Sequence, residues 1–158
     1  MTALVIAAAI VSVATTASAQ QGHGRAIGID ERTRGAERVV VGTVLRSEAI
    51  QQLNDYGDQL IVSHTLVRVD ETMKGAPTAT VMVEVEGGTL NGVVMRVSDM
   101  PRLEVGERAV LFLKRRTSDT YVPHLRGYGI LKLDKNGVVQ NSSLSVEQIR
   151  MIVRGVGR

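Results

Sequence analysis

The chain has 158 residues, of which 44% are hydrophobic, so it can build one domain with a core and is too short for two ordinary domains. It contains no cysteine, which excludes a disulfide scaffold, a thiol nucleophile and a cysteine-ligated zinc or iron–sulfur site. Lysine and arginine number 19 against 16 acidic residues, and this net charge of +3 is too small for a dedicated nucleic-acid-binding protein.

The first nineteen residues have the layout of a secretory signal peptide. Residues 3–14 form a nearly unbroken apolar run, and Ala17-Ser18-Ala19 follows as a small-x-small triplet. The run is shorter than the roughly 20 residues that a membrane-spanning helix needs, and it lacks a preceding lysine or arginine. We expect cleavage after Ala19 and a periplasmic or extracellular location; a buried N-terminal helix is the alternative.

The segment 20–36 has no hydrophobic periodicity, so we expect a flexible leader there and a single domain over residues 37–158. Within that domain, runs of β-branched residues separated by turn residues predict short strands. The first two are Arg38–Ser47 and Gln59–Val69, with a polar stretch and a turn over 48–58 between them.

Thr80–Glu86 is the clearest strand, because Val81, Val83 and Val85 alternate with Met82, Glu84 and Glu86. We expect the valines to face the core and Glu84 and Glu86 to face water. Further predicted strands are Val93–Val97, Arg108–Lys114, Tyr121–Leu125, Gly129–Leu133 and Val138–Val139.

The C-terminal segment predicts a helix over 145–155. Ser145 and Gln148 have capping-box spacing, and apolar residues from Val146 to Val156 recur at helical spacing. Six to eight short strands followed by one helix indicate a mainly β fold. We favour a small OB-like (oligonucleotide/oligosaccharide-binding) antiparallel barrel, closed or partly open, with one C-terminal helix; a sandwich is the alternative.

Five segments occur in one order over Val39–Val139: Val40–Val44, Val67–Gly75, Val83–Gly88, Met95–Arg102 and Val105–Leu113. Over these segments the chain resembles a family of bacterial secreted proteins that are often encoded beside predicted metalloproteases. The Val69-x-x-x-x-Lys74-Gly75 element is also similar to netrin-type and metalloproteinase-inhibitor OB barrels; the inhibitor domains use an N-terminal cysteine, which this chain lacks. The resemblance therefore implies a fold and an exported location, and no activity.

Residue types that carry catalysis or bind metals are scattered. Glu84 and Glu86 lie roughly 7 Å apart on one strand face, a separation that glycosidases use, but a solvated strand face is the simpler interpretation. His23, His64 and His124 have no metal-ligand spacing, and the segment 55–58 lacks the acidic pattern of a calcium loop. There is no Gly-x-Ser-x-Gly elbow and no phosphate loop. We expect no catalytic residue, no metal and no cofactor.

Basic residues concentrate near the C-terminus. Residues 114–158 hold nine basic and three acidic side chains, whereas residues 25–113 hold ten and thirteen. Lys114, Arg115 and Arg116 form a cluster, and Arg150 and Arg154 repeat along the predicted helix, so these five are the candidate binding residues. Arginines near a helix C-terminus also complement its dipole, which is the structural alternative.

The sequence therefore predicts a secreted, non-catalytic interaction module that binds another exported protein, with an exported protease as one partner to consider. Two alternatives stay open: a secreted hydrolase with an unrecognised site, and an OB-type binder of oligosaccharide or nucleic acid. The scarcity of stacking aromatics argues against nucleic acid. No membrane-spanning segment is expected after cleavage of the signal peptide.

Overall fold

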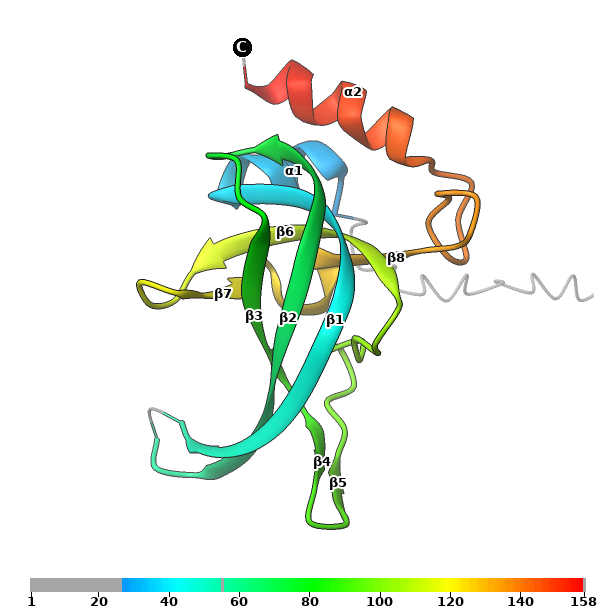
Figure 1. Ribbon diagram of the computed structural model, residues 1–158. Helices are drawn as coiled ribbons and strands as arrows, with labels where there is room; N and C mark the ends of the chain where they lie inside the picture. Colours follow the sequence, from blue (N-terminus) through cyan, green and yellow to red (C-terminus); the bar gives the residue numbers. More distant parts are fainter. Residues whose placement is uncertain (1–26, 55, 158) are drawn as a thin grey trace, which may run out of the picture.

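The computed structural model describes residues 27–54 and 56–157, so the expected signal peptide, residues 20–26 and His23 lie outside the described residues. Figure 1 shows the arrangement of the chain. Its elements in chain order are α1 (Ile29–Gly35), β1 (Arg38–Leu53), β2 (Gln59–Lys74), β3 (Thr80–Glu86), β4 (Gly88–Leu90), β5 (Val93–Met95), β6 (Arg108–Arg115), β7 (Thr120–Pro123), the 3-10 turn η1 (Arg126–Gly129), β8 (Ile130–Leu133) and α2 (Val146–Val156).

Strand pairing forms a closed circuit of five strands. β1 pairs with β2, β2 with β3, β3 with β7, β7 with β6, and β6 returns to β1, while β8 pairs with the first half of β6, ahead of the residues that pair with β7. The β3–β7 pairing is only two residues long, so the barrel is partly open at that seam. The predicted mainly β fold with one C-terminal helix is confirmed, with one correction to the antiparallel barrel: β3 and β7 run parallel, because β6 pairs antiparallel with both β1 and β7.

The first two strands are longer than the sequence indicated. β1 continues to Leu53 and β2 to Lys74, so the polar stretch 48–53 is strand and not loop. It was missed because this hairpin extends past the barrel, where polar residues can face solvent (Figure 1). The turn was placed correctly: the Asn54 N–H donates to the Asp58 carbonyl at 2.9 Å.

Two hydrophobic clusters lie on the two faces of the sheet. The barrel interior contains Val81, Val83 and Val85 together with buried residues of β1, β2, β6 and β7, which confirms the predicted phase of β3. The other cluster joins β1 and β6 to the helices through Phe112, Ile149 and Val153. The long apolar run of β6 is therefore buried on both faces.

The helix α1 lies within the segment expected to be a flexible leader, and this corrects that expectation for residues 29–35. Ile29 is buried in the cluster beneath α2, and Thr33 is also buried. Lys74 holds the C-terminal end of α1, because its ammonium donates to the Thr33 and Ala36 carbonyls at 2.7 and 2.6 Å. The segment was missed because one helix of seven residues carries too few apolar positions to show a period.

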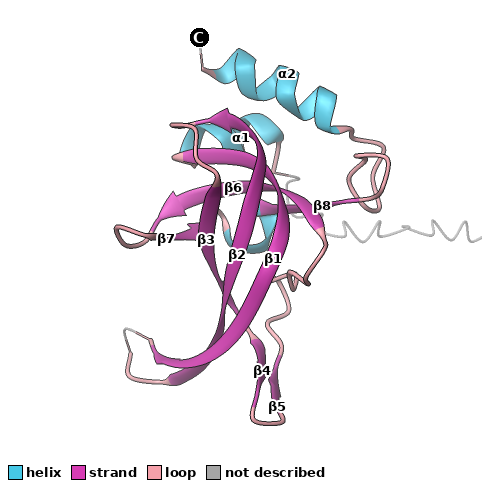
Figure 2. Cartoon of the chain, in the orientation of Figure 1, coloured by secondary structure: helices cyan, strands magenta, loops and turns pink. Residues whose placement is uncertain are grey.

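The C-terminal helix forms as predicted, with bounds Val146–Val156, and it lies against the same side of the sheet as α1 (Figure 2). The capping box is complete, since Ser145 Oγ accepts from the Gln148 N–H and Gln148 Oε1 accepts from the Ser145 N–H. Val146, Ile149 and Val153 are buried beneath it. Among the described residues, neither helix has the length and apolar character needed to cross a membrane.

Candidate functional site

The lower end of the molecule in Figure 1 is formed by two hairpins that extend past the closed circuit. One consists of β1 and β2 and the other of β4 and β5. Of the ten exposed large hydrophobic side chains in the described chain, seven lie on these hairpins or just before β6: Leu45, Ile50, Leu53, Tyr56, Val93, Val94 and Val105. This end therefore carries most of the exposed apolar surface.

β1 loses its second neighbour at Val44. Up to Thr43 it pairs with β6; the Val44 N–H then donates to the Glu107 carbonyl, and the Gly106 N–H donates to the Val44 carbonyl, both at 2.9 Å. A register shift between Val44 and Arg46 leaves Leu45 without a partner on β2, and such bulges bend a strand.

From Leu45 to Leu53, β1 has β2 on one side and no strand of the described chain on the other. We call this segment the β1 edge. Half of the backbone amides and carbonyls of an edge strand point away from its neighbour, so they are available to a further strand.

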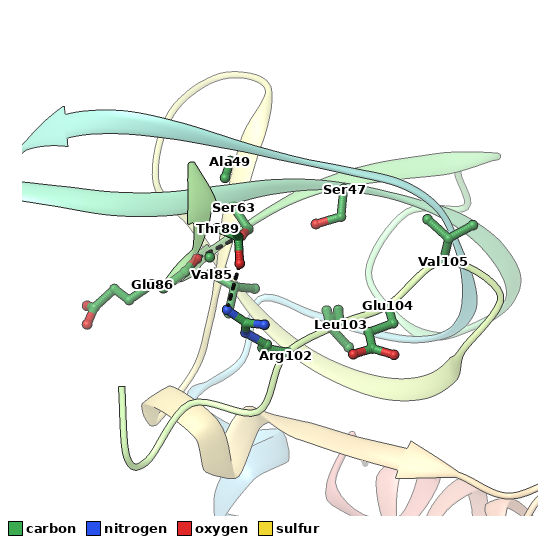
Figure 3. Close-up of a pocket in the computed structure, with 12 residues that line it drawn as sticks. Ser47, Ala49, Ser63, Val85, Glu86, Thr89, Arg102, Leu103, Glu104 and Val105 are labelled. Atoms are coloured by element: carbon green, nitrogen blue, oxygen red, sulfur yellow. Dashed lines mark hydrogen bonds between the residues drawn. The ribbon is translucent and has the colours of Figure 1, made fainter. Parts of the chain in front are cut away.

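A cleft of about 290 Å³ borders the β1 edge (Figure 3), and we call it the edge cleft. Small side chains of the long hairpin line one wall: Ser47, Ala49 and Ser63. The segment Arg102–Val105 lines the other wall, and the buried side chains of Val85 and Leu103 close the space toward the barrel interior. Small residues in one wall and apolar residues at the base leave room for one side chain from outside.

Hydrogen bonds hold the walls of the edge cleft in place. Ser63 Oγ donates to the Gly87 carbonyl at 2.7 Å, which ties β2 to the junction of β3 and β4. Arg102 Nη2 donates to Thr89 Oγ1 at 3.2 Å, as the dashed line in Figure 3 shows. These two bonds connect β2 to the junction of β3 and β4, and β4 to the segment Arg102–Val105, so both walls of the edge cleft are held by hydrogen bonds.

The close packing of β4 against the long hairpin requires a glycine. Gly88 has a φ of +156°, and a Cβ there would lie 2.7 Å from Ser63 Oγ and 3.1 Å from the Ala49 Cβ. The Gly87-Gly88 pair, which directly follows β3, therefore positions the short hairpin beside the edge cleft.

The expectation that Glu84 faces water is wrong, because the exposed fraction of Glu84 is only 7%. It does lie on the outer face of β3, opposite His64 on β2. Arg116, which follows β6, covers it, with Nη1 3.0 Å from Glu84 Oε1; His64 Nε2 is 3.4 Å from Oε2 without the alignment of a hydrogen bond. A cross-strand partner and an arginine from a distant turn cannot be read from the alternation of one strand.

Arg126 is a contact residue that the sequence did not single out. Its guanidinium donates to both carboxylate oxygens of Glu86, at 3.0 and 2.9 Å, and to the carboxylate of Asp99. The hydrogen bonds to Asp99 and Glu86 raise the pKa of Arg126, and those from Arg126 lower the pKa of Asp99. Arg126 therefore ties the segment after β5 to the end of β3.

The candidate binding residues around the end of β6 are largely engaged within the chain. Arg116 pairs with Glu84, and the Arg115 guanidinium lies 3.7 Å from Glu37 and 5.0 Å from the Tyr121 ring centroid. Lys114 is exposed. These contacts give Arg115 and Arg116 structural roles that the charge pattern did not reveal.

The other two candidates lie on α2. Arg150 donates two hydrogen bonds of 2.7 Å to the Glu71 carboxylate, which lower the pKa of Glu71 and raise that of Arg150. Arg154 is exposed and borders a cleft beside Lys74 and Met73. The five candidates thus belong to separate elements, the end of β6 and α2, and three of them hold carboxylates of the same chain.

The remaining candidates form isolated positions. Burial, with the nearby Lys114 and Lys74 charges, lowers the pKa of His124. Asn54 Oδ1 accepts from the N–H groups of Tyr56 and Asp58, which is the geometry of a plain turn. Within 27–54 and 56–157, no three histidine, aspartate or glutamate side chains come close enough to hold a metal ion.

Comparison of the sequence with protein-family models and with curated proteins finds no match in either case.

Proposed function

We propose that this protein is an exported, non-catalytic module that binds another protein at the end formed by its two hairpins. The observation that carries the proposal is the gathering of exposed large hydrophobic side chains there, next to an unpaired strand edge. Leu53 is 62% exposed and Tyr56 91% exposed at the tip of the long hairpin. Apolar surface of this kind marks interaction sites, and aromatic side chains are enriched in them.

The ionisable groups at this end support binding over catalysis. Glu84 is ion-paired with Arg116 and Glu86 with Arg126, so each carboxylate is already paired with an arginine and is poorly suited to act as a general base. The partner we propose is another exported protein. The resemblance to proteins encoded beside metalloproteases makes a neighbouring exported protease the first one to test.

Affinity capture from periplasmic or culture extract, followed by binding measurements with the purified captured protein, tests this function. We expect one stoichiometric protein partner, at least tenfold weaker binding by Leu53→Asp, and unchanged binding by Met151→Asp. Met151 is the matched control, because it is 66% exposed and lies on α2. Turnover of a glycoside, ester or peptide substrate by the purified protein, without any protein partner, would show the proposal to be wrong.

A second candidate, an oligosaccharide binder, is favoured by a cleft over β2 and β3 that Tyr56, Glu84 and Arg116 border. OB folds bind ligands on this strand face and at the loops that flank it. Tyr56 would stack on a sugar ring, and the charged groups would bind its hydroxyls. A glycan array with wild type and Tyr56→Ala separates this function from protein binding.

A further inference from the structure

We propose that the β1 edge binds an extended segment of the partner as an added strand. A large apolar side chain of that segment would enter the edge cleft between one acidic and one basic neighbour. This inference rests on the proposed function and specifies the chemistry of its partner.

The backbone of the β1 edge is prepared for a further strand. The ladder between β1 and the β6 side ends with the two hydrogen bonds of Val44, and β1 continues to Leu53 without a neighbour there in the described chain. A segment beside Leu45–Leu53 would therefore continue the row that β6 begins. Long unpaired edges with exposed apolar residues are the usual place for strand addition.

The edge cleft selects the side chain that points inward. Ser47 and Ala49 line it from β1, and Val85 and Leu103 supply buried apolar surface at its base. A side chain opposite Ser47 would enter this space, which the exposed side chain of Val105 also lines. A leucine-sized or aromatic residue fits the chemistry of the lining, because it would bury apolar surface that is now wet.

The charges on the other face select the two flanking residues. Arg46 and Glu48 alternate with Ser47, so they lie on the opposite face of β1 from the cleft; their charged groups are 3.4 Å apart and exposed. Residues directly opposite each other across a strand pair interact, and opposite charges stabilise the pair. An acidic residue opposite Arg46 and a basic residue opposite Glu48 would each form a cross-strand ion pair.

A second copy of this chain is a poorer occupant. Its own β1 edge would offer Ser47 or Ala49 to the cleft, and neither fills it. Antiparallel self-pairing centred on Ser47, which would match Arg46 with Glu48, places Gln51–Leu53 of the second copy along positions where β6 already pairs. Self-association is therefore an outcome for the experiment to identify.

Selection from a displayed library of random twelve-residue peptides tests the proposal on the full domain. We expect enriched peptides to carry a large apolar residue flanked directly by one acidic and one basic residue. The double variant Arg46→Glu/Glu48→Arg keeps the local ion pair and should enrich peptides with the reversed charge order. A purely structural role of Arg46 and Glu48 would not reverse that order.

Binding of a selected peptide is then measured on single variants. Ala49→Trp fills the edge cleft and should weaken the peptide at least tenfold, whereas Ala79→Trp, exposed in the turn before β3, should not. Amide exchange should slow along Leu45–Leu53 when the peptide binds. If Ala49→Trp fails to fold, the charge-swapped variant decides the question.

Peptides without the charge pattern, or binding that Ala49→Trp leaves unchanged, would overturn strand addition. Strand addition by a partner segment would also be overturned if no peptide bound and the chain formed a dimer that Ala49→Trp abolished. Failure of this inference is distinguishable from failure of the proposed function. A captured protein that still binds Ala49→Trp but loses binding to Leu53→Asp leaves the function standing and the binding mode wrong.

Discussion

Val83 and Glu84 are neighbours on β3 that point to opposite faces, and both are buried. Val83→Asp places an unpaired carboxylate in the barrel interior and should cost several kcal/mol of unfolding free energy. Glu84→Ala should cost about 1–2 kcal/mol, because Arg116 loses its ion-pair partner but can reach water. Urea unfolding of both variants measures these costs.

Glu48→Ala is the matched control for Glu84→Ala, because Glu48 is exposed on β1, on the other side of β2 from Glu84, and should change stability by less than about 0.5 kcal/mol. If Glu84→Ala and Glu48→Ala had the same free energy of unfolding, Glu84 would contribute no more to stability than an exposed residue. Equal costs of Val83→Asp and Glu84→Ala would mean that the phase of β3 is wrong.

Glu71 gives the fold a pH dependence of defined sign. The hydrogen bonds from Arg150 hold its pKa below the ordinary value of 4.5. The unfolded chain therefore binds more protons at this site, and the pair stabilises the fold above about pH 4.5 and loses that effect as the pH falls through the lowered pKa. Arg150→Gln should lower stability at pH 7, and the difference from wild type should shrink toward pH 3.

Urea titrations at pH 7, 5 and 3 measure this difference, with Arg46→Gln as the control because both members of the Arg46–Glu48 pair are exposed. A difference that stays constant or grows in acid would contradict the assignment of the stabilisation to the ionised Glu71.

At the scale of elements, the C-terminal helix depends on its first turn. Ser145→Ala removes the acceptor for the Gln148 N–H and should cost about 1 kcal/mol. Ser143→Ala, in the preceding loop, is the control and should be nearly neutral. Thermal unfolding followed by circular dichroism compares the two, and equal melting temperatures would mean that the capping box contributes nothing.

Elements with a local signal were predictable, and those set by tertiary contacts were not. The alternation in Thr80–Glu86 and the cap at Ser145 depend on residues within one turn or strand, and both predictions hold. The helix α1 depends on Lys74, more than 30 residues away, and the strand character of 48–53 depends on pairing with β2. Nothing local marks either one.

The candidate site shows the same division. Basic clustering indicated Arg115, Arg116 and Arg150, but their acidic partners Glu37, Glu84 and Glu71 come from other elements. The β1 edge could not be predicted, because whether a strand has a free edge depends on how the other strands are arranged around it. Only the Gly87-Gly88 pair gave a sequence signal near the edge cleft, through its glycines.

For the whole molecule, we predict a fold that does not depend on a metal ion. The described residues bring no three metal-ligating side chains together, so chelation should leave the melting temperature unchanged. A drop of several degrees in EDTA would contradict this and would direct attention to His64 and His124. Scanning calorimetry with and without EDTA makes the measurement.

The whole molecule offers two candidate docking regions, the hairpin end and the exposed basic residues, and one double variant distinguishes them. Lys114 and Arg154 are exposed and take no part in the ion pairs of Arg115, Arg116 and Arg150, so Lys114→Gln/Arg154→Gln removes positive charge without breaking those pairs. If the partner docks at the hairpin end, this variant should change partner affinity less than twofold and leave its salt dependence intact, whereas Leu53→Asp should weaken it at least tenfold. Binding isotherms at two salt concentrations decide between the surfaces. A flattened salt dependence in the double variant, with Leu53→Asp unaffected, would move the docking surface to the basic residues that the sequence first indicated.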